Sequence, residues 1–274
     1  MTTAPQIQAQ SERMRAVWGA ADYQPIAVQD VLVSELLAFA ADVHSGHRVL
    51  DVATGTGNSA LAAARRGARV TATDFVPAML ETASRRAVAE GLDLRVEVAD
   101  AQDLPFEDDS FDVVLSSFGA MYAADQQRTA HELMRVCRPG GRIGMANWTP
   151  GGLVARLQKI IAAHMPPPPA SAPRPTPPVL WGDEEHCRRL FGSGVTSLTA
   201  VPRTDEWCAA SAEDQVDLLR RHLAPWRAAE EKLPPEGRER LAQAAIAEIA
   251  GANRATDGTL VAGADYLEIV AIVA

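Results

Sequence analysis

The first half of the chain alternates between short apolar runs that suit strands and alanine-rich or amphipathic segments that suit helices. A helix is expected at residues 29–41, and the runs at residues 48–53, 69–74, 94–100, 111–117 and 142–147 are expected to be strands separated by helices. Such alternation predicts right-handed crossovers and a parallel, doubly wound α/β sheet. The run FDVVLSS is mostly apolar, as expected of a strand buried on both faces.

The pattern changes after Trp148. A helix is expected at residues 153–164, followed by PPPPASAPRPTPP, which should be extended and stiff. This segment is either a surface linker or a wall of a substrate pocket. A strand is expected at residues 195–201 or 203–209, another at residues 265–273, and helices at residues 212–223 and 235–250. Helices inserted between the last two strands would form a cap.

Charge and composition limit the classes of partner. The formal net charge of −9 argues against a broad surface for nucleic acid or anionic lipid and favours a small-molecule substrate. No apolar run approaches the roughly 20 residues of a membrane span, and the N-terminus lacks the apolar core of a signal peptide. A cytoplasmic protein is therefore expected. Its three cysteines are far apart and suit neither a zinc site nor a disulfide framework.

The turn LDVATGTGN, at residues 50–58, follows the first expected strand. Gly55, Gly57 and Ala60 have the GxGxxA spacing of a dinucleotide-binding loop, but Asp51 lies just upstream. A pyrophosphate would be repelled by this carboxylate. A ligand with an ammonium and a sulfonium group would instead be favoured there, while the glycines allow a close backbone approach. S-adenosylmethionine is such a ligand.

Two further acids follow the next strands. Asp74 ends the second strand, where a carboxylate can accept hydrogen bonds from both ribose hydroxyls of either NAD or S-adenosylmethionine. Asp100 ends the third strand and could accept from the adenine amine, while the Ala101 N–H addresses a ring nitrogen. All three acids should face the crevice at the carboxyl edge of the sheet.

Four successive motifs, VLDVATGTG, VTATDFVPAML, VADAQDLPFEDDSFDVVLSS and ELMRVCRPGGRI, resemble those of class I S-adenosylmethionine-dependent methyltransferases, near the ubiquinone and menaquinone C-methyltransferase type. The resemblance covers residues 48–147. It implies a mostly parallel, seven-stranded, Rossmann-like sheet with an antiparallel last strand and a helical cap. It also implies a helical segment covering the cofactor at residues 1–47, a cofactor-binding core at residues 48–150, and a substrate side at residues 151–274.

The resemblance also implies roles for individual residues. Asp51 would contact the methionine amino group, Gly55 and Gly57 would line the cofactor, and Ser116 would lie beside the methionine moiety. Asp74 would hold the ribose, with Asp100 and Ala101 at the adenine. The first glycine of the family's usual E/DxGxGxG is Ala53 here, a common replacement that narrows the site slightly.

Aromatic and sulfur side chains are further candidates for the cofactor site. Phe75 follows the ribose acid directly, and Met79 could pack on the adenine face or belong to the core. Trp18 and Tyr23 could lie over the cofactor or pack an N-terminal helix.

No residue is specific enough to be named as a catalytic base. His164, His186 and His222 belong to segments that should build the substrate pocket, and Tyr122 could reach its mouth. His131 is expected on the surface. The acids of residues 107–109 fall in a turn where solvated carboxylates are ordinary, so no metal site is expected.

Three functions are compatible with these features. The first is transfer of a methyl group from S-adenosylmethionine to a carbon, oxygen or nitrogen of a secondary metabolite or quinone-like compound in a bacterium. The second is an NAD-dependent oxidoreductase, which Asp51 disfavours. The third is a methyltransferase-like protein that binds ligand without catalysis. The sequence is silent on the oligomeric state and allows a homodimer.

Overall fold

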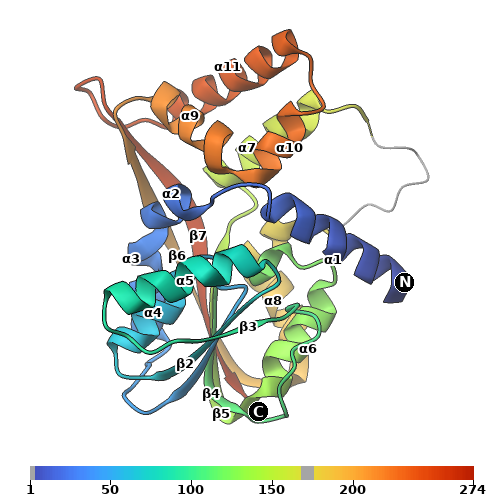
Figure 1. The fold of residues 1–274 in the computed structure, drawn as a ribbon, viewed down its shortest axis with the longest axis vertical. Coiled ribbons are helices and arrows are strands. Elements are labelled where there is room, and N and C mark those ends of the chain that lie inside the picture. Colours follow the sequence, from blue (N-terminus) through green and yellow to red (C-terminus); the bar gives the residue numbers. More distant parts are fainter. Residues whose placement is uncertain (1–3, 168–175) are drawn as a thin grey trace.

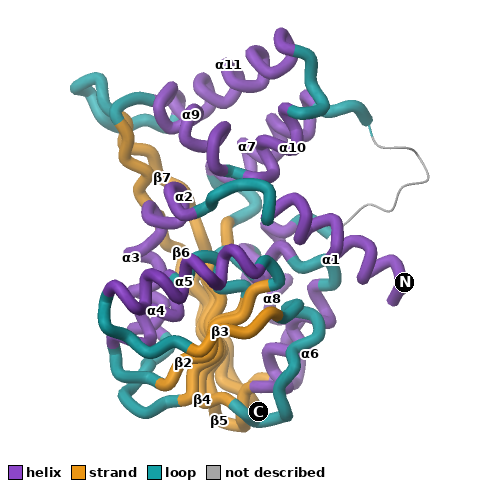
Figure 2. Tube along the Cα trace, viewed as in Figure 1, coloured by secondary structure: helices purple, strands orange, loops and turns teal. Residues whose placement is uncertain are grey.

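A computed structural model describes residues 4–167 and 176–274. The prediction for the proline-rich segment concerns mainly residues 168–175, which lie outside the described part. A seven-stranded sheet forms the centre of the molecule, with helices on both sides (Figures 1 and 2). Its strands are β1 (Arg48–Val52), β2 (Arg69–Asp74), β3 (Arg95–Val98), β4 (Phe111–Ser117), β5 (Cys137–Trp148), β6 (Val195–Ala209) and β7 (Leu260–Val273).

The strand order is β3-β2-β1-β4-β5-β7-β6. The strands from β3 to β5 pair in parallel, whereas β7 is antiparallel to both β5 and β6. The chain order reverses between β1 and β4, and in such sheets ligands bind in the crevice outside the carboxyl ends of the strands. The predicted doubly wound sheet with an antiparallel last strand is therefore confirmed.

Two differences from the expected strands concern the second half of the sheet. The alternative strands at residues 195–201 and 203–209 are one continuous strand, β6, which pairs with β7 along its length. The strand expected at residues 142–147 begins earlier, at Cys137, so that Pro139 and Gly140 lie within β5, where the register with β4 shifts. Gly140 has a φ of +72°, which glycine adopts without strain.

Helices α3, α4 and α5 lie on one side of the sheet and α6 and α8 on the other (Figure 1). The α-helices are α1 (Ala4–Trp18), α2 (Gln24–Ala27), α3 (Val31–Ala40), α4 (Asn58–Arg65), α5 (Pro77–Ala89), α6 (Gln126–Val136), α7 (Leu153–His164), α8 (Glu184–Phe191), α9 (Ala212–His222), α10 (Ala224–Glu230) and α11 (Pro235–Gly251). Short 3-10 helices are η1 (Val28–Asp30), η2 (Ala120–Tyr122), η3 (Pro178–Gly182) and η4 (Gly192–Gly194).

The helices between β6 and β7 form the expected cap. Helix α11 packs against α7 and α9, and α10 contacts α1, so the N-terminal helix lies beside this cap (Figure 1). Helix α9 ends at His222, and α10 begins two residues later with Pro225 in its first turn. Proline lacks the N–H that a continuous helix would need there, which explains the break.

Candidate active site

A pocket opens at the carboxyl ends of β1, β2, β3 and β4. It contains about 960 Å³ of space between protein atoms, part of it open to solvent. Nine of the twelve predicted cofactor residues line it: Trp18, Tyr23, Ala53, Gly55, Asp74, Phe75, Met79, Asp100 and Ala101. The other three, Asp51, Gly57 and Ser116, are buried and do not line the pocket.

The glycine turn forms part of the pocket floor. Ala53 and Gly55 have φ values of +53° and +55°, and Gly57 has a φ of +95° as the N-cap of α4. A side chain on Gly55 would find its nearest neighbour, the Met79 sulfur, at 3.9 Å, whereas one on Gly57 would lie 2.8 Å from Cβ of Ala83 in α5. Gly55 is therefore open toward the pocket, while Gly57 allows α4 and α5 to pack closely.

Asp51 stabilises the turn from below. Its Oδ2 accepts hydrogen bonds from the Thr54 hydroxyl at 2.5 Å and from the Ala60 N–H at 2.8 Å. Its Oδ1 has no hydrogen-bond partner among the described residues, although the side chain is buried. Burial raises the pKa of Asp51 to about 7. This carboxyl thus joins the end of β1 to the start of α4.

Asp74 joins the end of β2 to the same turn. One carboxylate oxygen accepts from the Gly55 N–H at 2.9 Å, and the other accepts from the Val76 N–H at 2.8 Å. Burial raises the pKa of Asp74 to about 6, and the backbone hydrogen bonds oppose that shift. Because each carboxylate oxygen has two lone pairs, the two oxygens still have lone pairs for hydroxyl donors from the pocket.

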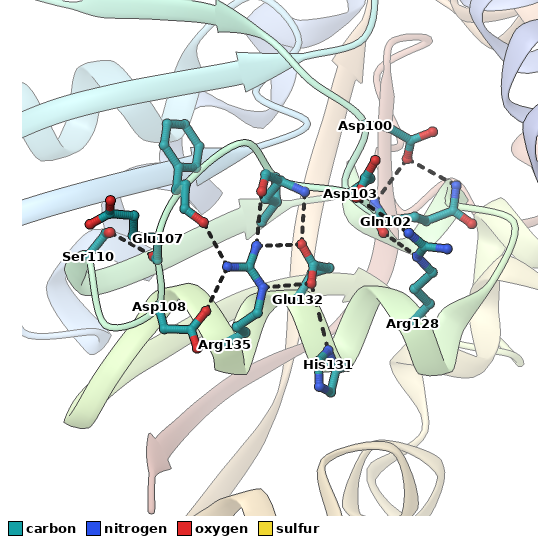
Figure 3. A network of polar contacts seen from close by, with 12 residues as sticks. Asp100, Gln102, Asp103, Glu107, Asp108, Ser110, Arg128, His131, Glu132 and Arg135 are labelled. Carbon is teal, nitrogen blue, oxygen red and sulfur yellow. Dashed lines mark hydrogen bonds and ion pairs between the residues drawn. The ribbon is translucent and has the colours of Figure 1, made fainter.

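Asp100 begins a loop that helix α6 holds in place (Figure 3). Its Oδ1 accepts from the backbone N–H and the side-chain amide of Gln102, at 2.9 and 3.0 Å. Arg128 of α6 donates to the Gln102 carbonyl at 2.5 Å. Arg135 donates to the carbonyls of Leu104 and Phe106 at 2.9 and 2.7 Å. These contacts fix the loop next to the predicted adenine position.

Ser116 and the neighbouring Ser117 differ in their surroundings. The Ser116 hydroxyl donates to the Val52 carbonyl at 2.8 Å and accepts from the Ala120 N–H at 3.0 Å, so it ties β4 to β1. Ser117 lines the pocket instead, and its hydroxyl lies 2.7 Å from that of Ser59. The sequence alone did not indicate which of these adjacent serines lines the pocket, because either could lie at the end of the strand with its hydroxyl toward the ligand.

Aromatic side chains form the wall nearest the N-terminal segment. The Trp18 ring packs edge-on against the rings of Tyr23 and Tyr122, with centroids 5.7 and 5.2 Å apart. All three residues line the pocket. Burial raises the pKa of Tyr23 well above its usual value and that of Tyr122 to about 12, so both hydroxyls stay protonated at neutral pH.

Phe118 continues the pocket wall after β4. Its ring stacks on Trp148 with centroids 3.7 Å apart and planes inclined by 1°. Its φ of +53° is unusual for an aromatic residue and is the kind of backbone strain that concentrates at ligand-binding sites. The stack places Trp148 next to the pocket wall, whereas Trp181 is fully buried.

A pair of acids that sequence reasoning did not find lies at the same pocket. Asp30, from η1, lines the pocket and hydrogen-bonds to Asp205 of β6. Both side chains are buried, and burial raises the pKa of each carboxyl. No motif marks either residue, since they are distant in sequence and only the packing of η1 on β6 brings them together.

The candidate histidines lie outside the pocket lining. His164 contacts the Ile160 carbonyl of its own helix at 2.8 Å, and His186 contacts the Gln126 amide oxygen at 2.7 Å. His222 contacts the Asp22 carbonyl at 2.9 Å. His131 is exposed on α6. Of the four candidates for proton transfer, only Tyr122 lines the pocket.

A metal site was not expected, and the described residues contain no group of three or more His, Cys, Asp or Glu side chains placed to hold an ion. Asp108, from the acidic turn, pairs with Arg135 at 2.9 Å (Figure 3). No helix in the described part of the chain is long and apolar enough to cross a membrane.

The fold is Rossmann-like, and its pocket lies at the switch point of the sheet, where open α/β sheets bind ligands. Residues 49–141 match a methyltransferase domain model. An uncharacterized protein of Mycobacterium tuberculosis is 43% identical over 198 residues, which cover 72% of this chain and 71% of that protein. Demethylmenaquinone methyltransferase of Thermus thermophilus is 40% identical over 154 residues, or 49% of this chain and 70% of that enzyme.

Solved structures share the fold at lower identity. A Bacillus subtilis protein superposes with a TM-score of 0.58 at 19% identity, covering 88% of this chain and 97% of that one. The phosphoethanolamine N-methyltransferase 2 of Haemonchus contortus, solved with S-adenosylhomocysteine, gives a TM-score of 0.52 at 19% identity, covering 86% and 52% of the two chains.

The chain belongs to the class I S-adenosylmethionine-dependent methyltransferases. It is a methyltransferase for a small molecule, and its methyl donor is S-adenosylmethionine. This assignment favours the first of the three functions considered from the sequence over an oxidoreductase or a non-catalytic binding protein.

Proposed function

We propose that the pocket at the carboxyl edge holds S-adenosylmethionine with its ribose at Asp74 and its adenine beside Asp100 and Ala101. The supporting observation is the Asp74 carboxylate, which is buried, lines the pocket and keeps lone pairs for two hydroxyl donors. Phe75 and Met79 line the same part of the pocket. The methionine end would lie over the open side of Gly55.

The acceptor would enter from the side of the pocket that faces Phe118 and Tyr122. These residues and the Phe118–Trp148 stack offer aromatic surfaces, which suit an apolar or aromatic small molecule such as a quinone-like compound or another secondary metabolite. In this proposal residues 1–47 cover the cofactor, residues 48–150 hold it, and residues 151–274 build the substrate side.

When bound, S-adenosylmethionine supplies an electrophilic methyl carbon for an in-line displacement. The chain contributes mainly by holding the acceptor in line and excluding water, which can supply much of the rate enhancement. Trp18 and Tyr23, from the N-terminal segment, line the pocket and would restrict water access. No histidine is assigned as a base, since none lines the pocket.

Two measurements test this function. Isothermal titration calorimetry with S-adenosylhomocysteine and with NAD should give binding of the first alone, and preferential binding of NAD would contradict the proposal. Incubation with S-adenosylmethionine labelled in its methyl group and a panel of small metabolites should give a labelled product. Tight binding without turnover across a broad panel would favour a ligand-binding protein without catalysis.

We also propose that the protein acts in the cytoplasm without a nucleic-acid or membrane partner. The net charge of −9 supports this, because polyanions would be repelled. Fractionation of cells expressing the protein, with and without high salt, would detect association with membranes or nucleic acid. Sedimentation velocity would distinguish a monomer from a homodimer.

A further inference from the structure

Asp30 and Asp205 form a carboxyl pair at the pocket wall. Asp30 lines the pocket at the end of η1, and Asp205 lies behind it on β6. They are 7% and 6% exposed, and their carboxyl groups hydrogen-bond to each other. The Oδ2 of Asp205 has no hydrogen-bond partner among the described residues. The Trp207 side chain lies close to Asp205 and opposes the rise in the pKa of that carboxyl, so Asp30 is the member of the pair that a ligand in the pocket can reach.

The charge of this pair is not balanced by a neighbouring base. Within residues 4–167 and 176–274, no Arg, Lys or His forms an ion pair with either acid, and the nearby Arg203 pairs with Glu268 at 2.9 Å. Two carboxyl groups in contact do not both ionise readily, so they share one proton once the first has ionised. In that state the pair holds one negative charge in a buried position.

The aromatic wall lies next to this charge. Asp30 is close enough to Tyr23 and Tyr122 to raise the pKa of both hydroxyls. Trp18 packs edge-on against the same two rings. Aromatic faces attract cations electrostatically, and combined with an unbalanced carboxylate they form the surroundings in which proteins bind ammonium groups.

We propose that Asp30, supported by Asp205, binds the ammonium group of an amine acceptor whose apolar body lies against Trp18, Tyr23 and Tyr122. This inference rests on the proposed function and narrows its acceptor class to amines. A carboxylate or phosphate at the same place would be repelled by the pair. The charged groups of the methyl donor could occupy the same place beside Asp30. The experiment must therefore measure binding of the acceptor and of the donor separately.

The test uses three probes that share one body and differ in the polar end: phenethylamine, 2-phenylethanol and 3-phenylpropionate. Each is titrated calorimetrically into the full-length protein saturated with S-adenosylhomocysteine. The amine should bind at least about tenfold more tightly than the carboxylate, the scale of a single desolvated cation–π or charge contact. In the variant Asp30→Asn/Asp205→Asn this preference should fall to about threefold or less.

Three results would overturn the proposal: no binding of the amine, equal binding of the three probes, or an unchanged preference in the double variant. A parallel titration with S-adenosylmethionine and S-adenosylhomocysteine should give affinities within about twofold of the wild type. A larger loss of donor affinity in the double variant would indicate that Asp30 and Asp205 bind the methyl donor and not the acceptor. Failure of the wild type to bind S-adenosylhomocysteine would contradict the proposed function itself.

Two further variants keep the test decisive. Asp30→Asn alone removes the carboxyl that lines the pocket and should lose most of the amine preference, so it serves if the double variant does not fold. Asp257→Asn changes an exposed acid remote from the pocket lining and should keep the wild-type preference. Circular dichroism verifies the fold of each variant.

Discussion

The Gly55 N–H donates a hydrogen bond to the Asp74 carboxylate at 2.9 Å, so the acid that ends β2 also fixes the glycine turn that follows β1. The other Asp74 oxygen accepts from the Val76 N–H at 2.8 Å. A single buried carboxylate thus sets the distance between the two loops that face the proposed cofactor, and its replacement should affect both loops.

Asp74→Ala should weaken S-adenosylhomocysteine binding by about 1 to 3 kcal/mol, the scale of leaving hydrogen-bonding groups unpaired. Asp74→Asn is the matched control, since its amide oxygen can still accept one of the backbone hydrogen bonds, and it should lose less affinity. Calorimetric titration measures both. Unchanged affinity in Asp74→Ala would contradict the assignment of this acid to the ribose.

The free energy of unfolding should depend on pH in part because of the ionisation of Asp51. Its folded-state pKa of about 7 lies above the ordinary 3.8, so the folded protein binds the proton more tightly than the unfolded chain does. This contribution is fully present below about pH 4 and is lost as the pH rises through about 7. In Asp51→Asn, urea unfolding between these pH values should show a smaller loss of stability than in the wild type. An identical pH profile of the two proteins would count against a raised pKa.

Substitution of the two turn glycines should show which of them the packing of α4 against α5 requires. Gly57→Ala would combine a left-handed φ with a Cβ only 2.8 Å from Ala83, and should lower the free energy of unfolding by about 2 to 4 kcal/mol. Gly55→Ala retains the strain but has room for the methyl group, so about 1 kcal/mol is expected. Urea unfolding compares them, and equal losses would refute the packing role of Gly57.

Arg135 should contribute to stability through the loop that follows Asp100. It donates to two loop carbonyls and pairs with Glu132 at 2.7 Å (Figure 3). Arg135→Met should lower the free energy of unfolding by about 1 to 3 kcal/mol, because two partly buried carbonyls lose their donor. Arg189→Met removes an exposed i,i+4 pair and should cost less than about 0.5 kcal/mol. Chemical denaturation measures the free energy of unfolding of both variants. Similar losses in the two would disprove this role of Arg135.

Much of the core could be predicted because short stretches of sequence are enough to indicate its strands and helices. Alternating apolar and helical segments identify the parallel strands, and the acids at or within two residues of the ends of β1, β2 and β3 follow directly from those runs. The long β6 was harder to predict, since Pro202 and polar residues interrupt its apolar pattern and suggested two alternatives. The length of β6 is set by its pairing with β7 from Val195 to Ala209. Such pairing between distant segments cannot be recognised from the sequence of either segment alone.

The site was less predictable at the level of single side chains. Asp51 and Ser116 each lie one residue before the end of the adjacent strands β1 and β4, yet both bind backbone partners and do not line the pocket. There the carboxylate and the hydroxyl hold the turn and the strand ends together. Asp30 was missed because its significance depends on Asp205, which is 175 positions away and meets it only in the folded chain. Local motifs cannot indicate such pairs.

The central claim is that the pocket holds the donor with its nucleoside between Asp74 and Asp100. A crystal structure of the protein with S-adenosylhomocysteine tests it most directly. We expect the ribose hydroxyls within hydrogen-bond distance of the Asp74 carboxylate, the adenine beside Asp100 and Ala101, and the sulfur on the side of Tyr122. A nucleoside bound elsewhere, or a ribose that does not contact Asp74, would contradict the account.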